Sequence, residues 1–217
     1  QGKGHNGAVR PFRLLGPDHL GALALTVGLA AAAAALARRD ARGRATLAVR
    51  ALLALGLVAL LAAELGTAAR EGWLTWTTLL PLELCDAALL LALLVLWRQP
   101  RWAAELLWFW AGAGTLPALL TPDVGEGFPS LWFVAFFGLH GLVVATAVLA
   151  VFGLGLRPRP GAARRAFVLT LAWAALAGLA NLALGTNFMY LRHKPAAPTL
   201  LDQLGPWPLY LVTSAAL

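Results

Sequence analysis

The stretch LWFVAFFGLHGLVVATAVLAVFGLGL, residues 131–156, decides the fold because it contains no charged residue. A helix that crosses the hydrocarbon core of a bilayer needs roughly 20 predominantly apolar residues, and this stretch is longer. In hydrocarbon, each backbone N–H and C=O must find a partner within the protein, which an α-helix provides. We therefore predict a transmembrane helix here, with His140 as its single ionisable residue.

Six more apolar runs surround this stretch, and the whole chain is 60% apolar and 12% charged. Soluble domains are closer to 45–50% apolar and about 25% charged. We expect an all-α, polytopic bundle of six to seven spans, in which residues 11–217 form a single domain. The polar, glycine-rich residues 1–10 are set aside as a tag remnant or disordered tail. The further runs are 20–36, 46–68, 79–97, 103–120, 166–189 and the short 207–217.

The net charge of +7 would suggest nucleic-acid binding in a soluble protein, but here the arginines lie between apolar runs. Most of them fall in the first, third and fifth loops, and Arg38, Arg39, Arg42 and Arg44 fall in the first alone. The positive-inside rule then places these loops in the cytoplasm and the N-terminus outside. We predict a multi-pass protein of the cell membrane, with membrane phospholipids as partners and neither nucleic acid nor a soluble protein among them.

Cysteine and histidine usage excludes several kinds of site. The only cysteine is Cys85, so no intrachain disulfide forms. One cysteine and a few histidines at these spacings match no zinc motif, and we expect neither a metal nor a cofactor.

Polar residues gather in the outer halves of the expected spans, while the inner halves are nearly pure Ala, Leu and Val. At 1.5 Å per residue, Cys85 lies roughly 9 Å and His140 roughly 14 Å from the outer ends of their runs, near the level of phospholipid ester groups. Buried polar groups in a span often mark function. A structural interpretation stands beside this one, because a lone Cys is usually an inert small hydrophobe and Asn181 and Asn187 could simply bond neighbouring helices.

Four motifs are more specific than generic membrane sequence. They are PLELCD (81–86), LLTPD (119–123), GTNFMYLRHKP (185–195) and GPWP (205–208). Together they resemble the YwaF-like family of bacterial integral membrane proteins, from about Pro11 to the chain end. That family is more distantly similar to a vertebrate seven-span membrane acyltransferase that remodels ether phospholipids.

The resemblance implies acyl transfer, with Cys85 as nucleophile and His140 as its acid–base partner. A thiolate attacks an acyl carbon, and a neighbouring imidazole activates it. Supporting roles then follow for three groups of residues. The predicted hydrogen-bond donors to the oxyanion are Asn181, Thr186, Asn187 and Thr121. The residues predicted to orient His140 or to bind an ammonium group are Glu83, Asp86 and Asp123. The residues predicted to bind a lipid phosphate are Arg192, His193 and Lys194. His19 is the alternative partner for Cys85.

Three other functions remain open from the residues. One is a lipid hydrolase, in which water replaces the acyl acceptor. The second is a non-enzymatic protein that binds or transports a lipid or small solute, against which the apolar inner halves argue. The third is a structural or assembly subunit of the membrane.

Overall fold

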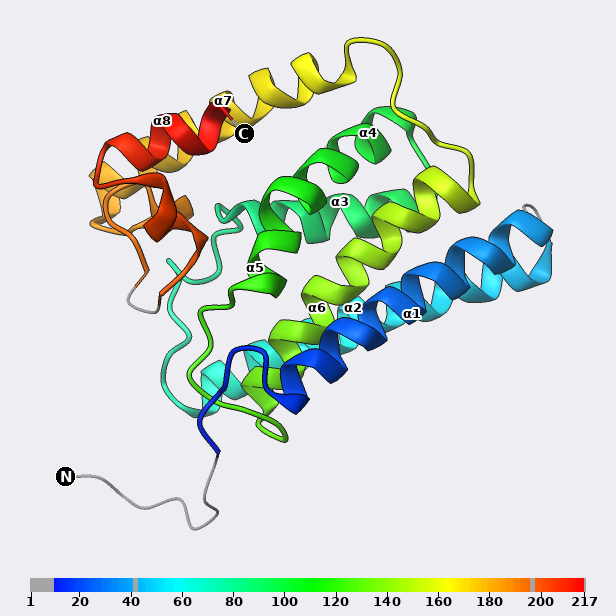
Figure 1. Ribbon diagram of the computed structural model, residues 1–217, viewed down its shortest axis with the longest axis horizontal. Helices are drawn as coiled ribbons and strands as arrows, with labels where there is room; N and C mark the ends of the chain where they lie inside the picture. Colours follow the sequence, from blue (N-terminus) through cyan, green and yellow to red (C-terminus); the bar gives the residue numbers. More distant parts are fainter. Residues whose placement is uncertain (1–9, 41–42, 196–197, 217) are drawn as a thin grey trace.

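The computed structural model describes residues 10–40, 43–195 and 198–216, so the expected tail at 1–10 lies, apart from Arg10, outside the described residues. Throughout these ranges the chain is all-α, without a strand (Figure 1). The elements are α1 (Pro17–Arg39), α2 (Arg44–Arg70), α3 (Leu84–Arg98), α4 (Arg101–Trp110), the π-turn η1 (Ala111–Thr115), α5 (Leu116–Leu120), α6 (Leu131–Val148), the π-turn η2 (Leu149–Gly153), α7 (Ala162–Leu184), the 3₁₀ turns η3 (Phe188–Tyr190) and η4 (Leu200–Leu204), and α8 (Leu209–Ala216).

Among the described residues, five helical segments are long and apolar enough to cross a membrane: α1, α2, Arg101–Leu120, Leu131–Gly153 and α7. This confirms the all-α, polytopic prediction. Two further runs form shorter helices, α3 with 15 residues and α8 with 8. At 1.5 Å per residue, α3 is roughly 22 Å long.

The start of α3 differs from the prediction. The apolar run opens at Leu79, but the helix begins only at Leu84. Pro81 has no backbone N–H and disfavours the α conformation of Leu80 before it. Cys85 therefore lies in the first turn of α3, and not a turn and a half inside a helix.

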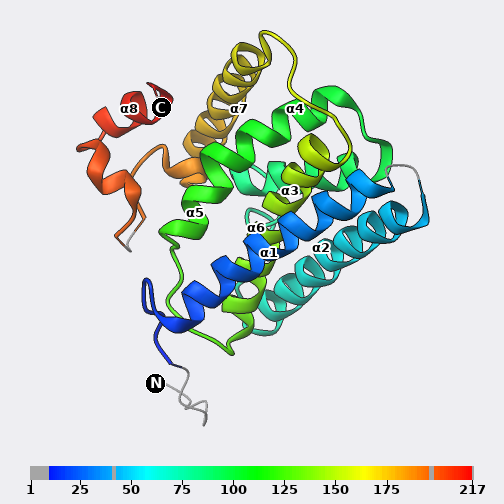
Figure 2. The same ribbon diagram turned by 45° about the vertical axis from the view of Figure 1, so that its right-hand side comes forward.

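Helix α6 forms the centre of the bundle and packs against α1, α2 and α3. Two of its glycines allow close approach. A Cβ at Gly141 would lie 2.6 Å from Thr26 Oγ1 of α1, and one at Gly138 would lie 2.5 Å from Leu60 Cδ1 of α2. In lipid, the hydrophobic effect does not drive helices together. Small residues at helix contacts let the helix backbones approach closely and gain van der Waals contacts. By contrast, α7 is the least buried span and lies with α8 at the edge of the bundle, beyond α4 (Figures 1 and 2).

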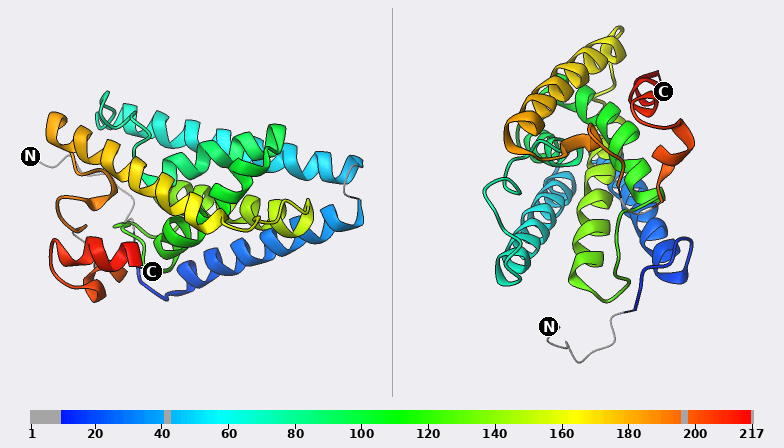
Figure 3. Two further views of the ribbon diagram at one scale, coloured as in Figure 1. Left: turned by 90° about the horizontal axis from the view of Figure 1, so that it is seen from above. Right: turned by 90° about the vertical axis from the view of Figure 1, so that its left-hand side faces the viewer.

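The helices run between two ends of different chemistry (Figure 3). We call the end where α1, α3 and α6 begin the cysteine end, and the end with Arg39, Arg98 and Ala162 the arginine end. The loops that join α1 to α2 and α6 to α7 both lie toward the arginine end. Which end faces the cytoplasm stays a prediction from the loop charges.

A buried carboxylate joins three segments at the arginine end, and the sequence analysis did not single it out. Glu105 of α4 has a side chain only 5% exposed. Its Oε1 accepts from Arg159 Nε at 2.6 Å, and its Oε2 accepts from Arg165 Nη2 at 2.9 Å. Because both carboxylate oxygens are bonded to guanidinium groups, this cluster fastens α4 to the α6–α7 loop and to the start of α7.

Candidate functional site

Cys85 is a free, half-buried thiol at the cysteine end. Its helix, α3, packs against both η1 and α6, and its thiol lies beside Thr115, the last residue of η1. The Thr115 side chain is buried, and its hydroxyl has no hydrogen-bond partner of ordinary geometry among the described residues. A buried hydroxyl left without a good partner costs about 1–3 kcal/mol, so its place beside a thiol calls for an explanation.

The π-turn that carries Thr115 has a local cause. The segment AGAGTLP runs from Ala111 to Pro117. Pro117 has no N–H to donate to the carbonyl of Ala113, so the regular α ladder is interrupted here. Single π-turns inside α-helices occur frequently at functional sites. Thr115 was not among the residues predicted from the sequence, although a threonine between glycines and a proline within an apolar run was a signal for it.

His140 has one ring nitrogen committed and one free. Its Nδ1 lies 2.8 Å from the carbonyl oxygen of Phe136. Because a carbonyl only accepts, Nδ1 carries the proton, and in the neutral ring Nε2 is an unprotonated acceptor. The ring stacks on Phe136 with centroids 4.2 Å apart. No described residue bonds to Nε2, and α6 packs against both α3 and η1.

His19 has the opposite arrangement. The backbone N–H of Leu15 donates to its Nδ1 at 3.0 Å, so Nε2 carries the proton and donates to the carbonyl of Leu119 at 2.8 Å. The ring is fully buried and makes an edge contact with Phe12. His19 therefore joins the start of α1 to the end of α5, and neither of its nitrogens is left for the Cys85 thiol.

Asn181, in the last turn of α7, and Asn187, in the loop after α7, both form hydrogen bonds with that loop. Asn181 Oδ1 accepts from Thr186 Oγ1 at 2.8 Å and from the backbone of Phe188 at 2.7 Å, while its Nδ2 donates to the carbonyl of Phe188 at 3.0 Å. Asn187 Nδ2 donates to the carbonyl of His193 at 2.9 Å. These amides hold the loop in shape, and their hydrogen-bonding capacity is largely used there.

Two acids fasten the same loop to the cysteine end. Glu83 Oε2 accepts from the backbone of Met189 at 2.8 Å, and the Tyr190 hydroxyl donates to Asp123 Oδ2 at 3.2 Å. Met189 and Tyr190 have φ angles of 56° and 51°, a left-handed conformation that costs non-glycine residues roughly 1 kcal/mol or more each. Burial, followed by the charge of Asp123, raises the pKa of the Tyr190 phenol, so it stays a donor at neutral pH.

Among the remaining polar residues, some side chains form hydrogen bonds and others have no hydrogen-bond partner in the described ranges. Thr121 Oγ1 accepts from the backbone of Leu200 at 3.2 Å and so joins α5 to η4. Asp86 lies within Coulombic range of Glu83 and Glu64, and in the described ranges neither Asp86 nor Glu64 has a hydrogen-bond partner. Within those same ranges, no group of His, Cys, Asp and Glu is placed to hold a metal ion.

Of the three residues predicted to bind a lipid phosphate, Arg192 has the most hydrogen-bond donors left without a partner among the described residues. Lys194 Nζ forms an ion pair with Asp202 at 3.3 Å and lies 5.4 Å from the centre of the Tyr210 ring. The His193 ring lies 3.1 Å from Asn187 Nδ2. The guanidinium of Arg192 makes a single hydrogen bond, at 3.3 Å to the carbonyl of Thr186, and no ion pair with a described residue.

Helices of this length and a polar cluster at one end define a polytopic α-helical membrane protein. The sequence profile of the TMEM164 family matches residues 14–217, nearly the whole chain. The chain therefore belongs to the TMEM164 family, a family of membrane proteins. No curated protein and no solved structure matches it.

Proposed function

We propose that this protein is a membrane phospholipid acyltransferase or transacylase in which Cys85 is the nucleophile and His140 the acid–base group. The observation that carries the proposal is the tautomer of His140. Its Nδ1–H is held by Phe136, which leaves Nε2 as an acceptor on a helix that packs against both Cys85-bearing α3 and η1. A general base needs this open acceptor nitrogen. The resemblance of PLELCD and GTNFMYLRHKP to the YwaF-like family supports the same roles.

The proposed reaction has two half-steps. In the first, His140 Nε2 takes the thiol proton and Cys85 Sγ attacks an ester carbonyl carbon of a phospholipid. The C–S bond forms, the ester C–O bond breaks, and the lysophospholipid oxygen leaves with the proton from Nε2. In the second, the hydroxyl of an acceptor lipid gives its proton to Nε2 and attacks the thioester carbon. The new ester C–O bond forms, the C–S bond breaks, and Cys85 Sγ takes the proton back from Nε2. With water as acceptor the same steps give a hydrolase.

Thr115 joins the predicted residues in this mechanism. Its unpartnered hydroxyl beside the thiol is a donor for the thiolate or for the oxyanion of the tetrahedral intermediate. Asn181, Thr186, Asn187 and Thr121 then serve by holding the loop and α5 in place, since their groups are bonded there. Asp86 and Glu64 supply negative charge for a headgroup ammonium. From the loop charges we expect this layer to face the extracytoplasmic side.

The test is acyl transfer by purified protein in nanodiscs that contain a phospholipid with an isotope-labelled acyl chain and an unlabelled lysophospholipid with a different headgroup, so that the labelled diacyl product carries the acceptor's headgroup. The native chain should produce labelled diacyl product, and Cys85→Ala should fall to background. Elution volume and melting temperature confirm that the variant is folded. A folded Cys85→Ala protein that still transfers acyl chains contradicts the proposal, and labelled free fatty acid in place of diacyl product indicates the hydrolase.

A second function, non-enzymatic lipid binding or transport, is favoured by one observation, the apolar groove along α7 described next. It predicts that lipid binding persists in Cys85→Ala while no acyl product forms with either protein. The nanodisc assay therefore separates the two functions, because only the acyltransferase releases a labelled product.

A further inference from the structure

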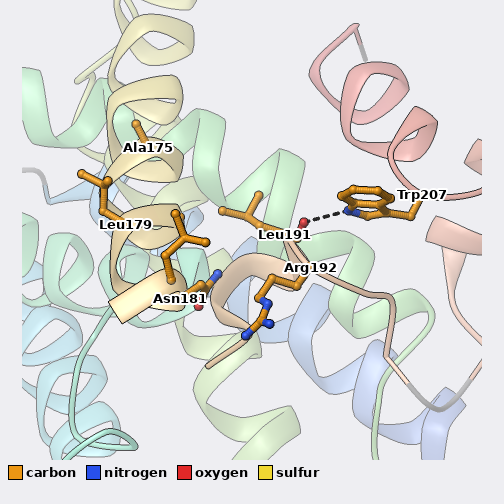
Figure 4. A pocket seen from close by; sticks show the side chains of 8 residues that line it. Ala175, Leu179, Asn181, Leu191, Arg192 and Trp207 are labelled. Atoms are coloured by element: carbon orange, nitrogen blue, oxygen red, sulfur yellow. Dashed lines mark hydrogen bonds between the residues drawn. The ribbon is translucent and has the colours of Figure 1, made fainter. Parts of the chain in front are cut away.

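A groove of about 650 Å³ runs along α7 where the helix faces the segment that follows it (Figure 4). Ligand sites in proteins typically have volumes of about 300–1,000 Å³ and combine apolar walls with a few polar groups. Most side chains that line this groove are apolar, and Arg192 is its one charged residue. None of the proposed reaction residues Cys85, Thr115 and His140 lines the groove.

The α7 wall of the groove suits an acyl chain. Ala175 and Gly178 occupy little volume on the α7 side of the groove. A Cβ added at Gly178 would meet only Leu191 Cδ1, at 3.8 Å. On the same stretch of α7, Leu179 is 66% exposed and Leu182 is 80% exposed. On a span of a membrane protein these exposed leucines face lipid, so the groove that they line is open to hydrocarbon chains.

The facing wall is held in place by a hydrogen bond. The indole N–H of Trp207 donates to the carbonyl of Leu191 at 3.1 Å, and Figure 4 shows the two side chains across from α7. Leu191 and Trp207 therefore form a preformed apolar wall, and a bound chain does not have to order it. Preformed walls favour binding because they lower the entropy that binding costs.

The polar end of the groove is at Arg192. In Figure 4 the Arg192 guanidinium lies at the level of Asn181, near the C-terminal end of α7, while Ala175 lies on an earlier turn, farther from that end. From Ala175 to Leu182 the helix rises roughly 10 Å, at 1.5 Å per residue. The charged group thus lies at the cysteine end of the groove, and the apolar part extends toward the bilayer interior. That order matches the phosphate and the acyl chain of one lipid molecule.

We propose that this groove binds a glycerophospholipid, with its phosphate on the guanidinium of Arg192 and one acyl chain along Ala175, Gly178 and Leu182. Arg192 has donors to spare because its guanidinium makes one hydrogen bond within the described chain, whereas Lys194 is paired with Asp202. A guanidinium binds phosphate through parallel hydrogen bonds that a lysine does not reproduce. The site goes beyond acyl transfer, since lipid binding there requires neither Cys85 nor His140.

The experiment uses purified full-length protein in detergent and a phosphatidylethanolamine with a photoreactive diazirine on one acyl chain. After illumination, mass spectrometry of the peptides locates the label. We expect labels on residues 175–182 and on Leu191, with equal yield in the native protein and in Cys85→Ala. Failure of acyl transfer therefore leaves this result unaffected, and failure of labelling leaves the Cys85 test unaffected.

Two variants, each with a matched control, test whether labelling of α7 reports specific lipid binding in the groove. Arg192→Gln should reduce α7 labelling about tenfold or more, because a charge-assisted hydrogen bond contributes about 1.5–3 kcal/mol and 1.4 kcal/mol is tenfold. Its matched control is Arg70→Gln, since Arg70 is also exposed at the cysteine end and also bonds one backbone carbonyl, that of Gly66 at 3.0 Å. Gly178→Leu should fill the groove and abolish labelling, while Gly28→Leu, on α1 with open space around it, should not.

Three outcomes would overturn the proposal. Labelling of α7 that survives both Arg192→Gln and Gly178→Leu shows only bulk lipid contact with an exposed helix. Equal labelling by a photoreactive diacylglycerol shows that phosphate is not recognised. Full competition by millimolar inorganic phosphate shows an anion site in which the apolar groove has no part.

Discussion

The two ends of the bundle hold polar clusters of opposite character. At the arginine end, Glu105 is buried and both of its oxygens bond to Arg159 and Arg165. At the cysteine end, the Thr115 hydroxyl and the His140 Nε2 have no such partner within the described chain. A satisfied buried cluster stabilises a fold, whereas unsatisfied groups cost about 1–3 kcal/mol each and are kept for another reason. The comparison separates a structural cluster from a candidate reaction site.

The same contrast holds between two histidines, His19 in the first turn of α1 and His140 near the middle of α6. His19 uses both ring nitrogens to join the ends of two helices, while His140 uses only one, and that within its own helix. Both residues are histidines on helices long and apolar enough to span a membrane, and their hydrogen bonds differ. Substituting each histidine therefore tests whether open bonding capacity marks function.

The largest effect is expected at His140. His140→Gln should lower the rate of acyl transfer by about 10²–10⁴-fold, the usual contribution of a general acid–base group, with little change in melting temperature. Initial rates in the nanodisc assay measure the first and thermal unfolding the second. His19→Gln is the control: it should lower stability by about 1–3 kcal/mol and keep the rate per folded molecule. An unchanged rate in His140→Gln would remove the distinction between the two histidines.

The next effect is expected at the arginine end. Glu105→Gln loses the charge that both arginines bond, and should lower the free energy of unfolding by about 2 kcal/mol, since a hydrogen bond to a charged group contributes about 1.5–3 kcal/mol. Thermal unfolding in detergent measures this loss. Acyl transfer per folded molecule should stay at the native rate, and a selective loss of activity would show that the cluster is not purely structural.

A smaller effect is expected at Thr115. Thr115→Val keeps the shape and removes the hydroxyl beside Cys85, so the transfer rate should fall about tenfold, or 1.4 kcal/mol in the barrier. Melting should be unchanged or slightly higher, because the variant has no buried hydroxyl without a partner. Thr146→Val is the matched control, since Thr146 is also buried but bonds the carbonyl of Leu142 at 2.8 Å. Equal rates in both variants would exclude Thr115 from the reaction.

The smallest effect is expected at Asp202. The backbone N–H of Thr199, and then the ammonium of Lys194, hold the pKa of this carboxyl below its ordinary value of 3.8. Its stabilising contribution is therefore present above that value and is lost as the pH falls through the lower, folded-state pKa. Because the group is exposed, Asp202→Asn should leave the melting temperature at pH 7 nearly unchanged. A large decrease would show that the Lys194 pair holds the loop more firmly than its exposure implies.

Much of the fold followed from residue order. Long apolar runs predicted the helices of residues 17–39, 44–70 and 162–184, because a span must satisfy its own backbone. The start of α3 was placed five residues too early, although Pro81 marked the interruption. The TMEM164 profile shows that the chain belongs to a family of membrane proteins, while the resemblance to the YwaF-like family and the roles of Cys85 and His140 stay predictions.

The sequence by itself determined the class of protein and the segregation of charge, because hydropathy and arginine position act locally along the chain. Only the tertiary structure decided which polar groups are engaged and which are open. Leu119 lies far from His19 in the chain, and Arg159 far from Glu105, yet each pair is bonded. Hydrogen bonds between distant segments leave no local pattern, so the open groups at Thr115, His140 and Arg192 became visible only once the helices were packed.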